Sequence, residues 1–327
     1  MSQFLFVLIA LSIVYGFING ALDSSNVVAT IISSRAMSPK RALVLSSIAH
    51  FIAPFIFGVS VAKTIGEGIV NPKAISLEIV FAALTGAILW NIITWILAIP
   101  SSSSHALIGG ILGSVTIKYG FNIIKIEGIV KVLVALIISP ILGLILGYIF
   151  MKVILFLIRG SSPKINIFFN KSQVLTSIAL SLSHGSNDAQ QTMGIITIVL
   201  VAAKLLTEFH VPLWVIFVSA LAISLGTAFG GRKIIKTMGS KFYKIRPIHS
   251  FTTQLCSSSI ILTAALLGGP VSTTHVVSSS MVGIGSAERL SKVRWGIVKN
   301  ILTAWLITIP VSALIASGIY YIISYYL

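Results

Sequence analysis

The sequence has very little charge and almost no cysteine. Only 9% of its 327 residues are charged and seven are acidic, whereas 56% are hydrophobic. Soluble domains carry about 25% charged residues and seldom contain an apolar run of about 18 residues. The composition therefore excludes a soluble protein and predicts an all-α membrane protein with several spans. The single cysteine, Cys256, excludes an internal disulfide and argues against a cysteine metal site.

The positive charge is confined to the stretches between the apolar runs. A net charge of +16 can indicate a nucleic-acid partner, but here the basic residues stand where they orient membrane proteins, so no such partner is predicted. No basic residue precedes the first apolar run and no cleavage site follows it, so we interpret it as a retained span. Spans are expected at 4–33, 42–62, 75–98, 129–157, 172–203, 213–231, 250–268 and 297–323.

Two shorter apolar segments, 101–117 and 271–286, are near the limit of about 17 residues for a crossing and either cross or re-enter. They also repeat each other. "IPSSSSHALIGGILGS" matches "GPVSTTHVVSSSMVGIGS", with His105 and His275 in the same position. "NGALDSSN" likewise matches "HGSNDAQQ", with Asp23 and Asp188 in the same position. The chain is thus predicted to be a duplicated unit.

The basic residues predict that the two halves have opposite orientations. In the first half they follow the first span, at Arg35 to Arg41, and in the second half they follow the second span, at Arg232 to Arg246. The positive-inside rule then predicts inverted repeats with both termini outside the plasma membrane. This arrangement places Lys118, Lys125 and Lys131 outside, where the rule predicts few basic residues. The expected organisation is an N-terminal repeat (1–160), a cytoplasmic linker (161–171), a C-terminal repeat (172–327) and about 10 to 12 transmembrane segments.

Inverted repeats are typical of secondary transporters, whose sites lie at discontinuous helices near the bilayer midplane. Each short segment begins with a proline and hydroxyl residues, which is a pattern of a helix start. Two facing helix starts offer N–H groups and hydroxyls to an oxyanion. Alternatively, the hydroxyls only cap or join helices. The candidate anion-binding residues are Ser101, Ser102, Ser103, Ser104, Ser272, Thr273 and Thr274.

The only two aspartates lie in apolar sequence, where a carboxylate costs a few kcal/mol. Such residues usually line an ion path, and the neighbouring amides supply further oxygen ligands suited to Na⁺, or the carboxylates take a proton. We expect the helices to unwind at Gly20 and Gly185. The alternative is a structural kink with a hydrogen-bonded aspartate. The candidate coupling residues are Asp23, Asn26, Asn187, Asp188 and Gln190, with Na⁺ at the two aspartates.

The histidines leave two interpretations open. His105 and His275 lie one turn into the expected anion helices, where they either carry a proton or pack as neutral rings. The remaining histidines show no matching pattern.

Four motifs, "HGSNDAQQTMG", "PSSSSHALIGGILG", "GGPVSTTHVVSSSMVGIG" and "KVRWGIVKNILTAWLITIPVSALIA", resemble the inorganic phosphate transporter (PiT) family in order and over nearly the whole chain. The resemblance implies cotransport of phosphate with Na⁺ or H⁺, an inverted-repeat fold and a homodimer. The family's Gly-x-Asn-Asp core matches Gly185, Asn187 and Asp188. Leu22 stands where the first half usually has asparagine, and Gln191 where lysine is frequent.

Three other functions are considered: sulfate transport, an uncoupled anion channel and a serine hydrolase. The family includes sulfate permeases, so the anion is phosphate or sulfate. An uncoupled anion channel fits the helix starts, although buried carboxylates would repel an anion. A serine hydrolase does not fit, because adjacent Ser104 and His105 point apart on a helix and no Gly-x-Ser-x-Gly motif is present. We therefore expect a symporter rather than an enzyme, with no cofactor beyond the transported ions.

Overall fold

The computed structural model describes residues 2–70, 75–240 and 243–326, and these form helices without a β-strand. Lys241, part of the expected basic loop, lies outside the described residues. The elements are α1 (Ser2–Ser33), α2 (Pro39–Phe57), α3 (Ser60–Lys63), η1 (Thr64–Gly68), α4 (Leu77–Ile96), α5 (Ser103–Tyr119), α6 (Ile126–Leu157), α7 (Ile165–Ala202), α8 (Leu213–Phe229), α9 (Arg232–Ser240), α10 (Pro247–Leu266), α11 (Thr273–Glu288), η3 (Leu290–Lys292) and α12 (Trp295–Tyr326).

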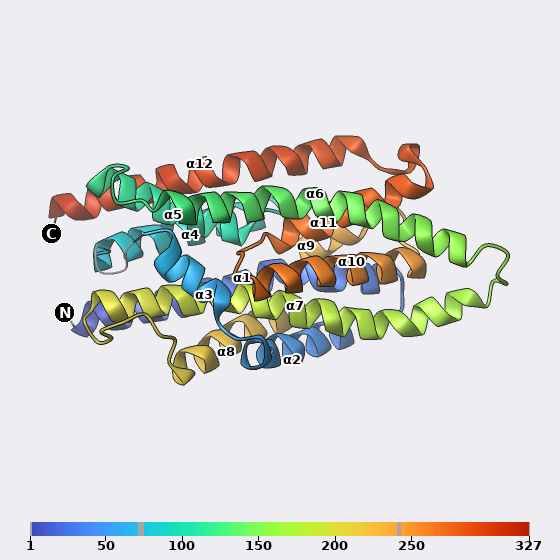
Figure 1. Cartoon of the computed structure of the whole chain (residues 1–327), viewed down its shortest axis with the longest axis horizontal. Coiled ribbons are helices and arrows are strands. Elements are labelled where there is room, and N and C mark those ends of the chain that lie inside the picture. Colours follow the sequence, from blue (N-terminus) through green and yellow to red (C-terminus); the bar gives the residue numbers. More distant parts are fainter. Residues whose placement is uncertain (1, 71–74, 241–242, 327) are drawn as a thin grey trace.

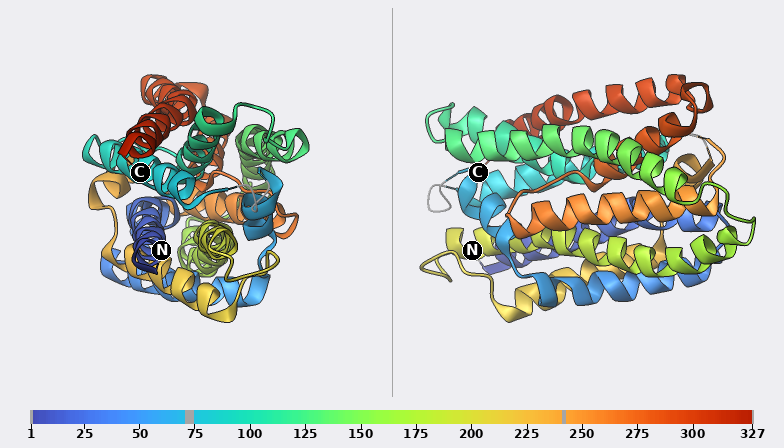
Figure 2. Two further views of the ribbon diagram at one scale, coloured as in Figure 1. Left: turned by 90° about the vertical axis from the view of Figure 1, so that its left-hand side faces the viewer. Right: turned by 45° about the vertical axis from the view of Figure 1, so that its right-hand side comes forward.

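The helices form two groups that run along the long axis of the molecule (Figure 1). Viewed end-on in Figure 2, α4, α5, α6 and α12 lie in one half and α1, α2, α7 and α8 in the other. Helix α10 packs against α7, while its successor α11 packs against α6, so this pair joins the two groups. Both termini lie at the same end of the molecule (Figure 1).

The two short apolar segments are the second arms of helical hairpins. Helix α4 turns back into α5, and α10 turns back into α11, with each pair side by side. Backbone at positive φ makes both turns, at Ala98 (54°) and Gly268 (72°). Pro100 and Pro270 follow these turns and prevent continuation of the preceding helix. The α4–α5 hairpin lies in the left half of Figure 1 and the α10–α11 hairpin in the right half.

The expected halves of the chain interlock. Helix α5 of the first half packs against α12 of the second, and α11 of the second packs against α6 of the first. Both long partners carry an interior proline at matching positions, Pro140 in α6 and Pro310 in α12. Residues 165–171 of the expected linker belong to α7, because this helix already begins at Ile165.

Among the described residues, five helices are long and apolar enough to cross a membrane: Gln3–Ser33, Pro39–Phe57, Leu77–Ile96, Ile126–Leu157 and Trp295–Tyr325. Helix α7 has 38 residues, but its buried middle is polar, from Ser181 to Thr192. The low hydropathy of α7 therefore comes from the polar residues that the fold buries at the centre of this helix. The described helices begin and end within a few residues of most expected spans.

Candidate functional site

The tips of the two hairpins meet in the middle of the molecule. The Ser104 hydroxyl donates to the Val271 carbonyl at 3.2 Å, and the His105 and His275 rings lie 4.4 Å apart between centroids. The two repeated segments are therefore brought face to face, as the paired motifs suggested.

Each tip uses one hydroxyl to begin its helix. Ser102 is the N-cap of α5 and accepts from the backbone N–H of His105 at 3.2 Å. Ser272 does the same for α11 and accepts from the N–H of His275 at 3.3 Å. These two residues therefore act as caps, which is one of the alternatives considered for the hydroxyl runs.

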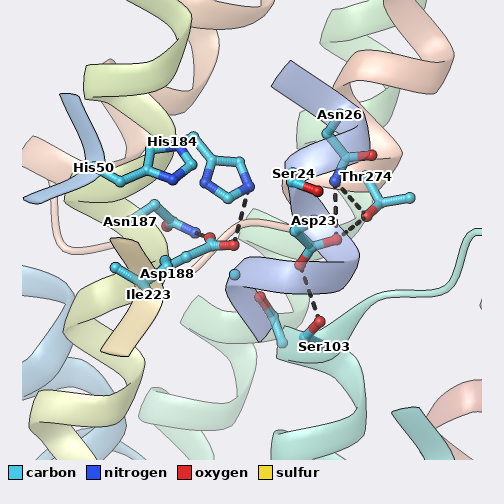
Figure 3. Close-up of polar contacts among 12 residues, drawn as sticks. Asp23, Ser24, Asn26, His50, Ser103, His184, Asn187, Asp188, Ile223 and Thr274 are labelled. Atoms are coloured by element: carbon cyan, nitrogen blue, oxygen red, sulfur yellow. Dashed lines mark hydrogen bonds and ion pairs between the residues drawn. The ribbon is translucent and has the colours of Figure 1, made fainter. Parts of the chain in front are cut away.

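The hydroxyls that follow the caps reach an aspartate instead. Ser103 of the first hairpin donates to Asp23 Oδ2, and Thr274 of the second donates to Asp23 Oδ1, both at 2.9 Å. Asn26 Nδ2 donates to Asp23 Oδ1 at 2.9 Å and to Thr274 Oγ1 at 2.8 Å. The Asp23 carboxylate thus joins both hairpin tips to α1 (Figure 3).

The second aspartate is held differently. Asp188 accepts from Asn187 Nδ2 at 2.6 Å and lies 3.3 Å from His184 Nε2, one turn earlier on α7. Thr273 of the second hairpin also interacts with Asp188. Asn187 additionally binds both backbone groups of Val271, at 3.1 Å to the carbonyl and 3.3 Å to the N–H. Asn187 therefore fixes the second hairpin tip as well as the carboxylate.

Asp23, Asp188 and His184 form one buried cluster. Ligand atoms of all three lie within 4.8 Å of one another, and the two aspartates are only 4% and 1% exposed. Two carboxylates at this separation repel each other strongly in a medium of low dielectric constant. A bound cation or a shared proton would remove most of that cost, so the cluster suits a small cation or a proton.

Several polar atoms around this cluster lack a protein partner within the described chain. They include amide and hydroxyl oxygens, which are among the groups that bind Na⁺ in proteins. Buried polar groups are normally satisfied, so a set of free oxygens indicates room for a ligand. These oxygens are Asn19 Oδ1, Ser25 Oγ and Asn26 Oδ1.

A small cavity beside Asp23 brings further candidate residues together. Asp23, Asn26, Ser101 and Thr274 line it, with Thr94 of α4. The Ser101 hydroxyl donates to Thr94 Oγ1 at 2.8 Å. The cavity wall thus combines hydroxyl and amide donors with one carboxylate acceptor.

Two expectations about the aspartate motifs are wrong. Helices α1 and α7 continue without a break through Asp23 and Asp188, and the chain is interrupted at the hairpin turns instead. Gly20 and Gly185 serve close packing: a Cβ on Gly20 would lie 2.2 Å from the Ile223 carbonyl oxygen. On Gly185 it would lie 2.8 Å from His50 Cα.

Gln190 also lies apart from the aspartates. Its Oε1 accepts from the backbone N–H groups of Val61 at 2.7 Å and Ala62 at 3.2 Å, so it caps α3. The reason is helical geometry, because residues two apart point to opposite sides of a helix. Gln191, three residues after Asp188, is on the correct side and donates to Ser104 Oγ at 2.7 Å.

Sequence reasoning overlooked several residues of the site. His184 precedes Asp188 by four residues, a spacing that places both on one helix face, so this signal was available. His184 stacks on His50, with ring centroids 4.7 Å apart, and His50 Nδ1 lies 2.7 Å from Thr227 Oγ1. The Tyr15 hydroxyl lies 3.1 Å from the Ser103 carbonyl and 3.0 Å from Gln191 Oε1. No local pattern marks Tyr15 or His50, since their partners are far away in the chain.

His105 and His275 lie behind the tips. His105 Nδ1 is 2.7 Å from its own cap, Ser102 Oγ, and His275 stacks on Trp305 at 3.8 Å between ring centroids. Both rings thus pack at the junction of the hairpins.

The fold and this centre define a class: a multi-pass membrane protein with buried carboxylates held between two helical hairpins. A family model described as "Phosphate transporter family" matches residues 19–316. A "probable low-affinity inorganic phosphate transporter" of Rhizobium meliloti is 42% identical, over 96% of this chain and 95% of its own. One of Bacillus subtilis with the same description is 41% identical, over 97% of this chain and 96% of its own.

A solved structure, "The sodium-dependent phosphate transporter", matches with a TM-score of 0.90 over 99% of this chain and 100% of its own. Its sequence identity is 24%, so this likeness concerns the fold. The chain belongs to the phosphate transporter family, as its motifs suggested.

Proposed function

We propose that the protein imports inorganic phosphate together with a cation, Na⁺ or H⁺. The observation that carries this proposal is the position of Asp23, which accepts hydrogen bonds from both hairpin tips and lies in one cluster with Asp188. A cation at the carboxylates and an anion at the hydroxyls would then be in direct electrostatic contact. The names of the two bacterial relatives and of the solved structure support phosphate as the anion.

In this mechanism the cation binds first and neutralises the carboxylates. Phosphate then binds beside Asp23, between Ser101 and Ser103 of the first hairpin and Thr274 of the second. Without the cation the carboxylates would repel the anion, and without the anion the cation site would carry an unbalanced charge. The loaded and empty centres therefore reorient more readily than a half-loaded one, which couples the two fluxes.

The carboxylate beside the cavity also favours phosphate over sulfate. Near neutral pH phosphate carries at least one O–H group, which needs an acceptor, whereas sulfate carries none. Asp23 supplies such an acceptor among the donors of the cavity wall. A site for sulfate alone would be served better by donors only.

An uptake assay tests this proposal. The purified protein is placed in proteoliposomes, and labelled phosphate is followed with an inward Na⁺ gradient or an inward proton gradient, each imposed separately. Accumulation above the external concentration under one of the two gradients is expected, with little competition by sulfate. Equilibration without accumulation under both gradients would show that the protein is an uncoupled channel. Strong inhibition by sulfate would overturn the choice of phosphate as the anion.

The architecture proposed for this function is a pair of inverted repeats with both termini outside. Helices α1 and α7 carry the corresponding aspartates and run in opposite directions (Figure 1). The α1–α2, α6–α7 and α11–α12 connections lie at the end of the molecule away from the termini (Figure 1). Basic residues such as Arg35, Arg159 and Arg294 stand in these connections, which favours a cytoplasmic location for this end. Cysteines introduced at exposed Ser324 and Ser162 test this orientation with a membrane-impermeant maleimide on intact cells. Labelling at position 162 and not at 324 would reverse it.

A further inference from the structure

An apolar groove between α6 and α10 lies outside the site described above. Its cavity volume is about 750 Å³, and its walls carry Val134, Ile138 and Leu142 of α6 opposite Ile260 and Ala264 of α10. At its inner side it reaches Val271, the hairpin residue bound by Asn187 and Ser104. A ligand in this groove would therefore touch the second hairpin tip without entering the ion site.

Charge is found in the groove wall only at Glu127 and Lys131, in the first turns of α6. The next charged residue along this helix is Lys152, and the 21 residues from Lys131 to Lys152 span about 31 Å at 1.5 Å per residue. This length matches the hydrocarbon thickness of a bilayer, about 30 Å. Lys131 therefore lies at the level of the lipid head groups, and the groove descends from there into the hydrocarbon.

The two charges are free to bind a ligand. Glu127 and Lys131 are four residues apart, yet neither takes part in the ion pairs found between described residues. Lys131 Nζ lies near the turn that follows α10, since a Cβ added to Gly268 would lie 3.4 Å from it. A negative and a positive side chain one turn apart match a head group with one positive and one negative charge.

We propose that this groove binds a glycerophospholipid with a phosphoethanolamine head group. Lys131 binds the phosphate, Glu127 binds the ammonium, and an acyl chain lies along α6 against Ala135 and Val271. Long basic side chains near the ends of membrane helices reach the level of the lipid head groups. The primary ammonium can approach and hydrogen-bond to Glu127, whereas the three methyl groups of a choline head group prevent that. The bound lipid bridges α6 to the α10–α11 hairpin and thereby holds the second tip in place.

The test uses the full-length protein in nanodiscs that contain equal amounts of phosphatidylethanolamine and phosphatidylcholine. Native mass spectrometry of the released protein measures which lipid stays bound. The wild type is expected to retain phosphatidylethanolamine preferentially, and the double variant Glu127→Gln with Lys131→Gln to lose about threefold or more of that preference, as for exposed ion contacts. Ala135→Trp fills the groove and should remove the bound lipid, whereas Ile145→Trp, on the same helix but outside the groove wall, should not.

Phosphate uptake provides the second measurement. In proteoliposomes containing phosphatidylethanolamine, the double variant should transport more slowly than the wild type, and in phosphatidylcholine alone the two should be equal. Equal retention of both lipids by the wild type would overturn the proposal. So would an equal loss of uptake in both bilayers, since the lysine would then act on the transported anion. A change of oligomeric state in Ala135→Trp would assign the groove to a second copy of the chain. If that variant does not fold, the double variant decides alone.

Discussion

Asp23 and Asp188 occupy matching positions in the sequence but have different surroundings in the structure. Asp23 accepts from Ser103, Thr274 and Asn26, and so connects α1 to both hairpins. The Asp188 carboxylate is held chiefly from its own helix, by Asn187 and His184. The difference teaches that the duplicated motif serves two tasks: Asp23 joins the hairpins where the anion is proposed to bind, and Asp188, paired with His184, carries the carboxylate proposed to bind the cation.

Neutralising each aspartate in turn should separate these tasks and gives the largest expected effects. Asp23→Asn and Asp188→Asn should each lower concentrative phosphate uptake by about 100-fold or more, because each removes a buried charge that the coupled ion requires. Only Asp23→Asn should also lose phosphate binding, since its carboxylate orders both tips. Uptake under an imposed gradient and equilibrium binding of labelled phosphate measure the two properties. Normal coupled uptake by Asp188→Asn would refute the role given to that residue.

The second difference concerns the residue before each aspartate. Asn187 holds the backbone of Val271 through two hydrogen bonds, whereas the first half has Leu22, which is buried beside Asp23. Exchanging these residue types tests whether the asymmetry matters. Asn187→Leu should reduce uptake by about 30-fold, because the second tip loses two hydrogen bonds at roughly 1 kcal/mol each. Leu22→Asn should change it less, since no hydrogen bond of the tips is lost. A larger loss in Leu22→Asn would show that the first half relies on an apolar contact there.

The sequence predicted the helices well, because apolar length is a local pattern, and the repeated proline and hydroxyl motifs suggested that two helix starts face each other. Apolar length marked most spans, and the pairing of Pro100 with Pro270 and of Asp23 with Asp188 marked the two motif pairs. What it could not predict is where the helices break. Glycine beside an aspartate suggested that the helix unwinds there. Position 20 instead requires a glycine because the carbonyl of Ile223 packs against it, and Ile223 is more than 200 residues away in the sequence.

Side-chain direction within the site was partly predictable. The spacing of four residues between His184 and Asp188 would have added His184 to the candidate site. The spacing of two between Asp188 and Gln190 would have removed Gln190 from it. Tyr15 could not be found in this way, since it reaches Ser103 and Gln191 through the fold. The capping role of Ser102 could not be told from the binding role proposed for Ser103, because four identical serines stand in a row and only the turn geometry distinguishes them.

Removing hydroxyl groups from the two hairpin tips should have a smaller effect on transport. Ser103→Ala with Thr274→Ala should weaken phosphate affinity by a few-fold to about tenfold, since each removes a hydroxyl beside the proposed anion site whose hydrogen bond to Asp23 is worth roughly 1 kcal/mol. The matched control is Ser102→Ala with Ser272→Ala, which removes the two caps and the contact of Ser102 with His105 Nδ1, and should lower stability by about 1 kcal/mol per cap. Uptake kinetics and thermal unfolding in detergent distinguish the pairs. Unchanged kinetics in the first pair would count against a paired anion site.

The smallest effect is expected at the far ends of the two hairpin helices, where the halves carry opposite charges. Lys118 near the end of α5 donates to Ser76 Oγ at 2.9 Å, while the matching Glu288 at the end of α11 binds Arg246, His249 and Lys292. Burial alone would raise the pKa of Glu288, but hydrogen bonds from His249 and Lys292 and the nearby positive charge lower it to about 2. Because the folded pKa lies below the ordinary value of 4.5, this carboxylate stabilises the fold above that pH. The contribution is lost as the pH falls towards 2.

Glu288→Gln should therefore lower the unfolding temperature slightly at pH 7. The expected loss of unfolding free energy is less than about 1 kcal/mol, since the charged partners Arg246 and Lys292 are exposed and partly exposed. The difference in stability between variant and wild type should narrow as the pH falls below 4.5, because the unfolded wild type then takes up a proton while its folded carboxylate stays charged until about pH 2. Unfolding curves of both proteins in detergent from pH 7 to pH 3 check this. A gap that stays constant over that range would show that Glu288 contributes through its shape and hydrogen bonds, and that the opposite charges of the two hairpin ends serve orientation in the membrane instead of stability.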